Sequence, residues 1–291
     1  MTDSPGGALS QVELVETQTP YGRFSSVAGD HISQQLQQYG AHTRNELAML
    51  LSFIRPGDTV VDVGAHIGSF AIPMARKGAA VFAFEPLPLL HSLLRRNISL
   101  NDLEHSITSY EAVVGNNDDP YRAAGIEVED TGKTKYIPGD DIAGVILDEW
   151  WDERGRPKID VLKVDVEGMD YEVLDGARRL VSASRPLVYV EIHRKRLGNS
   201  NVKAIEKLLR DNGYVFFRNV AARNSSLDDF RVSRVPNLLL GGGFFDLLAI
   251  PRQSDRYPAK SGSSLRTLGM VGLRRLPSWM QRLVRPERSS S

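Results

Sequence analysis

Hydrophobic positions along this chain follow two different spacings. Short runs rich in Val, Ile, Phe and Tyr, typical of buried strands, occur at 59–64, 79–86, 106–115, 159–168, 186–193, 214–220 and 244–251. Apolar residues at helical spacing occupy 29–40, 43–54, 67–77, 87–99, 170–182 and 201–212. Strands that alternate with helices are typical of parallel sheets joined by right-handed crossovers. The pattern predicts an α/β fold with a seven-stranded, mostly parallel sheet and helices on both faces.

Two stretches depart from this rhythm. Residues 1–20 are polar and marked by Gly and Pro, so we expect them to lack regular structure. Residues 116–158 contain the turn-forming stretch "NNDDP" and are expected to form an irregular insert. At the start of the second predicted helix, Thr43 and Glu46 have the spacing of a capping box.

The chain divides by composition into three parts. We expect an N-terminal extension with a lead-in helix at 1–42, one domain at 43–251, and a basic, flexible tail at 252–291. The net charge is zero, but the tail carries +7 and the rest of the chain −7. Residues 263–286 mix Leu, Met and Trp with Arg. They are expected to form either an amphipathic helix on an acidic partner or membrane surface, or an extension that is mobile or docks on the chain's own acidic body.

Composition also bounds the location and the partners. The chain has no cysteine, which fits a reducing compartment. Its first residues have neither the basic start nor the apolar core of a secretory signal, and no apolar run approaches the ~20 residues of a membrane span. We therefore expect a cytoplasmic protein without a transmembrane segment. The acidic body and the absence of a groove-reading motif argue against nucleic acid as a partner.

Acidic residues stand at the carboxyl ends of several predicted strands. Asp62, Glu85 and Asp165 each follow or end an apolar run, and Glu191 has a similar position in the run 186–193. In open parallel sheets, ligands bind outside the carboxyl ends of the strands. Because a buried charge is costly unless it has a partner, several acids at one edge indicate a polar site for a ligand with many donors.

The stretch "DVGAHIG" indicates the kind of ligand. Gly64 and Gly68 flank a tight turn, which lets the backbone approach a ligand closely. A dinucleotide site needs G-x-G-x-x-G, whereas here His66 interrupts the pattern, and Asp62 would face a diphosphate unfavourably. S-adenosylmethionine (SAM) has an ammonium, a sulfonium and a ribose diol but no phosphate. The turn therefore favours SAM over a nicotinamide cofactor.

Several motifs in order along the chain resemble the FkbM-type SAM-dependent methyltransferases. These motifs are "DVGAHIG", "FEP" (84–86), "LLRRNISLN" (93–101), "LKVDVEGMDYEVLDGA" (162–177) and "RPLVYVEIH" (185–193). The resemblance implies a Rossmann-like class I methyltransferase fold. It also implies O-methylation of hydroxyls on sugars or on polyketide-type and other secondary metabolites. His66 departs from the family, which usually has Asn there.

Cofactor roles follow from this resemblance together with the acids. Asp62 is expected to hold the amino-acid end of SAM, or alternatively to stabilise the following helix N-terminus. Glu85, followed by Pro86, is expected to accept hydrogen bonds from the ribose hydroxyls. Asn101 is placed near the adenine, with helix capping as the alternative. Gly64, His66, Gly68 and Asp165 complete the expected cofactor site.

O-methylation also needs a base for the acceptor hydroxyl. The available groups are Asp165, Glu167, Glu191 and His193, of which histidine has the pKa best suited to neutral pH. Carboxylates at three strand ends are also compatible with Mg²⁺, although the spacing does not require a metal. The insert 116–145, with Tyr136 and Asp140, is expected to cover the pocket of a small-molecule hydroxyl acceptor.

Two other functions stay open from the sequence. One is a non-catalytic binding or assembly subunit that keeps the SAM-binding fold. The other is an NAD-dependent reductase, against which His66 in the glycine turn argues.

Overall fold

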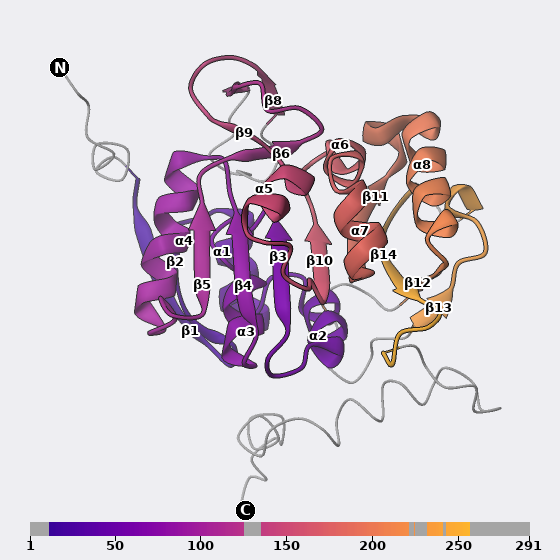
Figure 1. Cartoon of the computed structure of the whole chain (residues 1–291). Coiled ribbons are helices and arrows are strands. Elements are labelled where there is room, and N and C mark those ends of the chain that lie inside the picture. Colours follow the sequence, from indigo (N-terminus) through magenta and orange to yellow (C-terminus); the bar gives the residue numbers. More distant parts are fainter. Residues whose placement is uncertain (1–11, 125–134, 221–223, 225–231, 241–242, 257–291) are drawn as a thin grey trace, which may run out of the picture.

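The computed structural model describes residues 12–124, 135–220, 224, 232–240 and 243–256. Its main sheet consists of β3 (Thr59–Val63), β4 (Ala80–Phe84), β5 (Ile107–Tyr110), β10 (Val161–Val164), β11 (Leu187–His193), β12 (Tyr214–Asn219), β13 (Val232–Arg234) and β14 (Phe244–Pro251). In space they run in the order β13-β12-β14-β11-β10-β3-β4-β5 (Figure 1). All seven predicted strands belong to this sheet. The prediction missed β13, a short edge strand, so the sheet has eight strands rather than seven.

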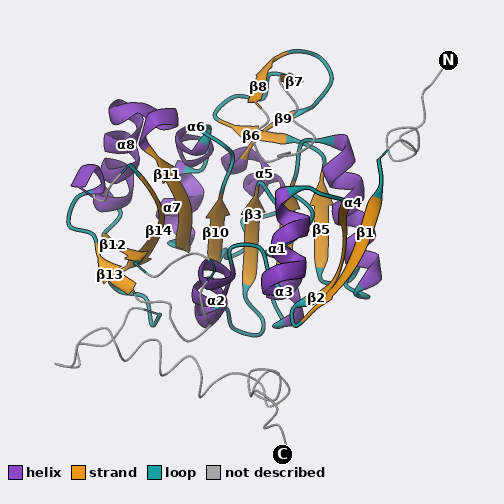
Figure 2. Cartoon of the chain, turned by 180° about the vertical axis from the view of Figure 1, so that it is seen from behind, coloured by secondary structure: helices purple, strands orange, loops and turns teal. Residues whose placement is uncertain are grey.

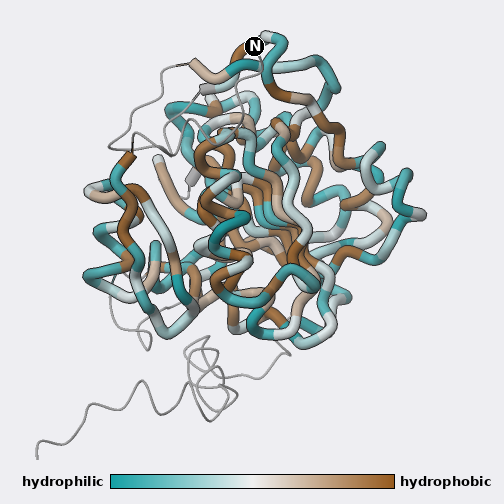
Figure 3. The backbone as a smooth tube through the Cα atoms, turned by 90° about the vertical axis from the view of Figure 1, so that its left-hand side faces the viewer, coloured by the Kyte–Doolittle hydropathy of each residue, from teal (hydrophilic) through white to brown (hydrophobic). Residues whose placement is uncertain are grey.

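Helices cover both faces of the sheet, as predicted. One face carries α1 (His31–Tyr39), α2 (Arg44–Phe53), α3 (Ala71–Arg76) and α4 (Pro88–Leu100). The other carries α5 (Leu147–Glu153), α6 (Asp170–Asp175), α7 (Arg178–Ser184) and α8 (Arg194–Asp211). Figure 2 shows α1, α2 and α3 in front of the sheet, and Figure 3 shows the apolar interior between the layers. The predicted helix 170–182 is two helices, because the chain turns at Gly176 and Ala177.

The order of the strands fixes where a ligand can bind. β3, β4 and β5 run parallel outward from the middle, and β10 and β11 continue parallel on the other side of β3. β14 is antiparallel to both β11 and β12. β3 and β10 are parallel neighbours, but the order of the strands changes direction between them. Ligands of open α/β sheets bind at such a switch point.

The N-terminal region is more ordered than the sequence predicts. Within 1–20, which we expected to lack structure, lies β1 (Leu14–Thr19), paired antiparallel with β2 (Gly22–Val27). The predicted capping box is also wrong. Thr43 has a left-handed backbone (φ 39°) and its side chain makes no capping hydrogen bond to α2. Gln35 instead accepts a hydrogen bond from the Thr43 amide at 2.9 Å.

Two small sheets, formed by the irregular insert and the residues just before it, lie above the carboxyl ends of β3, β4 and β10 (Figure 1). β6 (Val113–Gly115) pairs with β9 (Gly144–Ile146), and β7 (Tyr121–Ala124) pairs with β8 (Lys135–Pro138). β5 and β6 were predicted as one strand, 106–115, but the chain leaves the main sheet after Tyr110. Trp150 and Trp151 on α5 are buried, and Trp150 packs against Phe82 of β4 and Tyr110 of β5.

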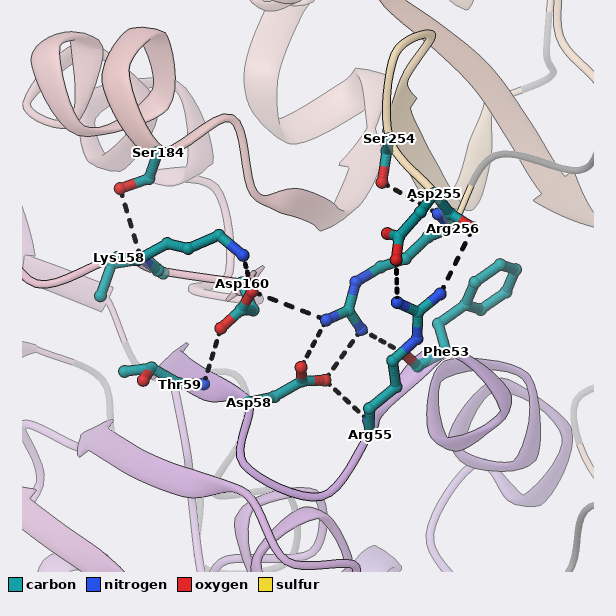
Figure 4. Close-up of polar contacts among 11 residues, drawn as sticks. Phe53, Arg55, Asp58, Thr59, Lys158, Asp160, Ser184, Ser254, Asp255 and Arg256 are labelled. Atoms are coloured by element: carbon teal, nitrogen blue, oxygen red, sulfur yellow. Dashed lines mark hydrogen bonds and ion pairs between the residues drawn. The ribbon is translucent and has the colours of Figure 1, made fainter.

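At the opposite edge of the sheet, a buried ion pair joins the end of the described chain to its body. Both oxygens of Asp58 contact the guanidinium of Arg256, and both side chains are 7% exposed (Figure 4). Arg256 also donates to the Phe53 carbonyl and lies 3.6 Å from Asp160. The tail predicted from residue 252 therefore has its first five residues attached to the domain, and residues 257–291 lie outside the described part.

None of the helices in the described ranges is both long and apolar enough to cross a membrane.

We predict that Arg256→Met lowers the free energy of unfolding by about 3 kcal/mol, because it leaves the Asp58 carboxylate buried without its cation. Arg55→Met is the matched control. It removes an exposed pair with Asp255 and should cost less than about 1 kcal/mol. Urea denaturation of both variants measures this difference, and equal losses would contradict a structural role for the buried pair.

Candidate active site

A cavity opens at the carboxyl edge of the sheet, at the switch point between β3 and β10. Its walls come from the turn after β3, the end of β4, the loop after β10, the N-terminal segment and β8. The lining residues are Ile32, His42, Gly64, His66, Ser69, Phe70, Glu85, Pro86, Leu90, Tyr136, Lys163, Asp165, Val166 and Glu167. The wall combines carboxylates, one ammonium group and apolar surfaces.

The turn after β3 depends on its glycines. Gly64 has φ 77°, and a Cβ there would lie 1.9 Å from the Asp165 carbonyl oxygen. Gly68 has φ 88°, and a Cβ there would lie 2.8 Å from Leu94. His66 between them also has a left-handed backbone, with φ 54°. The glycines thus let the turn pass close to the β10 loop on one side and α4 on the other.

Glu85 is held by backbone groups at the cavity wall. Its Oε2 accepts a hydrogen bond from the His66 amide at 2.8 Å, and its Oε1 accepts one from the Leu87 amide at 3.0 Å. The residue is 4% exposed, and burial raises its pKa from 4.5 to about 7. The two amides fix the carboxylate in one orientation, with its remaining acceptor capacity available to a ligand.

Asp62 and Lys163 form a buried ion pair at the cavity, with Lys163 in the wall and Asp62 behind it. Lys163 Nζ lies 2.9 Å from Asp62 Oδ1, and the side chains are 2% and 0% exposed. The same Nζ donates to the Gly64 carbonyl at 3.2 Å and lies 4.0 Å from Asp165 Oδ2. Burial raises the pKa of Asp62, and the Lys163 charge offsets part of this effect. Burial alone would lower the pKa of Lys163, but the neighbouring carboxylates outweigh it and raise that pKa.

The loop after β10 brings further acids to the cavity. Asp165 has 32% of its side chain exposed there. Glu167 has a left-handed backbone (φ 56°) and forms an ion pair with Arg196 on α8. Arg196 also lies 3.6 Å from Glu191 Oε2. Asp170 holds the loop by accepting hydrogen bonds from the Val166 and Gly168 amides at 3.4 and 3.2 Å.

The structure brings six of the predicted site residues to the cavity wall: Gly64, His66, Glu85, Pro86, Asp165 and Glu167. Asp62 and Gly68 support the wall from behind. Glu191 and His193 share a face of β11, as expected, but neither lines the cavity. His193 instead accepts a hydrogen bond from the Arg196 amide at 3.4 Å as the N-cap of α8.

Asn101 also lies away from the cavity wall. Its Oδ1 accepts a hydrogen bond from the Arg23 amide at 2.9 Å, and its Nδ2 donates to the Arg23 carbonyl at 2.7 Å. The same Nδ2 donates to the Asn97 carbonyl at 2.7 Å. The side chain therefore binds β2, and we leave it out of the cofactor site.

Sequence reasoning missed several wall residues, among them Lys163, Ile32 and His42. For Lys163 a signal was available, because a lysine within the apolar run 159–168 is rarely buried without a partner. Ile32 and His42 gave no signal, because their position depends on how the N-terminal segment folds back.

Tyr136 was expected near the acceptor, and it does line the cavity. Burial, with a smaller effect of Glu85, raises the pKa of its phenol.

Within the described residues, no three His, Asp or Glu side chains are grouped so that they could hold a metal ion.

Comparisons with known proteins agree on the type of domain. Residues 62–216, more than half of the chain, match the family described as the methyltransferase FkbM domain. The hexuronic acid methyltransferase AglP of Haloferax volcanii is 31% identical over 230 residues, which cover 73% of this chain and 91% of that protein. Methyltransferase sdnD of Sordaria araneosa is 31% identical over 153 residues, covering 40% of this chain and 59% of that protein.

Among solved structures, methyltransferase FkbM of Methylobacillus flagellatus is similar with a TM-score of 0.42 and 18% identity. The match covers 62% of this chain and 44% of that one.

We predict that Lys163→Met lowers the free energy of unfolding by about 3–5 kcal/mol at pH 8, since Asp62 stays buried without its cation. Without Lys163, the pKa of Asp62 rises further above its unfolded value. The loss should therefore grow as pH rises from 5 to 8 and shrink at low pH, where the carboxyl is neutral in both states. Denaturant unfolding at several pH values measures this.

The double variant Asp62→Asn/Lys163→Met is the control, because it removes both charges and should recover much of the loss. A Lys163→Met loss that is below about 1 kcal/mol, or independent of pH, would contradict the pairing.

Proposed function

Because the chain belongs to the FkbM methyltransferase family, we propose that it transfers a methyl group from SAM to a hydroxyl group of a sugar or polyketide-type natural product. The hydroxyl acceptor and the cytoplasmic location are parts of this proposal. Family membership favours it over an NAD-dependent reductase. The observation that carries the choice of donor is the fixed carboxylate of Glu85 beside the glycine turn.

The cavity wall fits the chemistry of SAM. Glu85 can accept hydrogen bonds from both ribose hydroxyls, because its backbone partners leave acceptor positions free toward the cavity. Pro86 and Leu90 give apolar surface for the adenine. Asp165, which is exposed in the wall, can face the sulfonium charge, which SAM carries and S-adenosylhomocysteine lacks. Asp62 is fully buried, so its role is to hold Lys163, which in turn binds the Gly64 carbonyl.

On the acceptor side, Asp165 is the group we assign as base. When bound, SAM supplies an electrophilic methyl group on a sulfonium. An aliphatic hydroxyl is a poor nucleophile until its proton is removed, and the base must be within hydrogen-bond reach. Asp165 lies in the wall with part of its side chain exposed, whereas Glu167 is engaged by Arg196. Glu167 therefore orients the loop, and Glu191 and His193 support it through Arg196 and α8.

The similarity to AglP supports a sugar as the acceptor, since that relative is a hexuronic acid methyltransferase. The insert that covers the cavity supplies Tyr136 at the wall, and a phenol with a raised pKa can donate a hydrogen bond to a sugar oxygen. We therefore propose that β7 and β8 contribute to acceptor selection.

We predict that the wild-type protein binds S-adenosylhomocysteine (SAH), the reaction product, and not NADH. Glu85→Ala should weaken SAH binding about 100-fold, which corresponds to two lost hydrogen bonds to a charged acceptor. Isothermal titration calorimetry measures both ligands. Glu111→Ala, at a partly exposed acid that contacts His91, is the control and should leave the SAH affinity unchanged.

The affinity should also depend on pH. The pKa of Glu85 is about 7, and the ionised form is the better acceptor for ribose. SAH affinity should therefore be constant above about pH 8 and fall up to about tenfold per pH unit below 7. Glu85→Gln should remove this dependence. Asp170 also has a pKa of about 7, so a pH dependence that persists in Glu85→Gln would point to the β10 loop instead.

We predict that Asp165→Asn lowers methyl transfer about 100-fold or more while changing SAH affinity less than about threefold. Transfer of radiolabelled methyl from SAM to a panel of hexuronic acids and neutral sugars measures activity. If wild type binds SAH but labels no hydroxyl-bearing acceptor, the non-catalytic subunit becomes the better interpretation.

A further inference from the structure

Asn97 of α4 and Asn101, the C-cap of the same helix, bind the backbone of β2 in the same way. Asn97 Oδ1 accepts a hydrogen bond from the Ser25 amide at 2.6 Å, and its Nδ2 donates to the Ser25 carbonyl at 3.0 Å. Asn101 makes the corresponding pair of hydrogen bonds with Arg23, at 2.9 and 2.7 Å. Each side-chain amide thus takes the place of a neighbouring strand for one residue of β2.

The match in spacing explains why this arrangement fits. Residues four apart on a helix are separated by about 6 Å along its axis, and residues two apart on a strand by about 6.6 Å. Asn97 and Asn101 therefore meet Ser25 and Arg23 in register. Gly22 leaves the room this requires, because a Cβ there would lie 2.6 Å from Asn101 Oδ1.

Asn97 makes one contact that Asn101 does not. Its Nδ2 also donates to the Ile67 carbonyl at 2.9 Å, within the turn that lines the cavity. The side chain is fully buried, and both its N–H groups and its oxygen are used. Reversing the amide would place the side-chain NH2 against the Ser25 N–H and the side-chain oxygen against the Ser25 and Ile67 carbonyls. The orientation of the side chain is therefore fixed.

We propose that Asn97 is a positioning residue for the cofactor, which couples docking of the N-terminal hairpin β1–β2 to the glycine turn after β3. In this arrangement the hairpin is a required part of the cofactor site although none of its residues lines the cavity. Residues of β2 lead directly into α1, and Ile32 and His42 line the same cavity, so the hairpin also anchors that wall. The effect on cofactor affinity rests on the function proposed above.

Asn101 provides a matched control, since it binds β2 equally but does not contact the turn. Asn97→Ala should weaken SAH binding about tenfold, the equivalent of one lost buried hydrogen bond, whereas Asn101→Ala should weaken it less than about threefold. Hydrogen exchange resolved by peptide should become faster at 22–27 in both variants. At 64–70 it should become faster only in Asn97→Ala.

A measurement on the wild type covers the case in which Asn97→Ala fails to fold. Coupling is reciprocal, so SAH should slow hydrogen exchange at 22–27 although it does not touch these residues. Equal SAH affinities of the two variants, or exchange at 22–27 that SAH leaves unchanged, would overturn the inference. If wild type does not bind SAH, the proposed function fails, and the exchange at 64–70 in the two variants still decides whether Asn97 holds the turn.

Discussion

The buried contact between Lys163 and Asp62 joins the two halves of the sheet, at the point where the order of the strands changes direction. Asp62 is the penultimate residue of β3 and Lys163 lies opposite it in β10, so the ion pair bridges the two strands of the switch point. Two charges taken out of water require good geometry, and here Lys163 also binds the Gly64 carbonyl. This contact holds the glycine turn in position and keeps Gly64 close to Asp165. The part of the cavity wall between β3 and β10 therefore depends on it.

Around the cavity, backbone groups orient the charged side chains. Glu85 is fixed by two amides, one from the glycine turn and one from the start of the next helix. Asp170 is fixed by two amides of the β10 loop. Both carboxyls have pKa values raised to about 7, because the protein removes them from water more than its hydrogen bonds compensate. Of the two, Glu85 lines the cavity, and a raised pKa at such a position is typical of functional sites.

The sequence predicted the main sheet and the acidic edge well because both rest on local patterns. Apolar runs marked the strands, and the acids after them marked the carboxyl ends. Contacts between distant segments left weaker signals. Nothing in "RFSSV" indicates that Arg23 and Ser25 would pair with asparagine side chains. The helix-cap alternative for Asn101 is correct, since it is the C-cap of α4, but its contact with β2 was not predicted. His193 and Glu191 were predicted on one strand face, yet neither lines the cavity, whereas Glu85 and two acids of the loop after β10 do.

A crystal structure of the protein with bound SAH tests the central claim most directly. The account predicts that the ribose hydroxyls lie within hydrogen-bond distance of Glu85, with the glycine turn against the ligand and the sulfur directed toward Asp165. SAH bound at another place, or in this cavity with its ribose away from Glu85, would contradict the account.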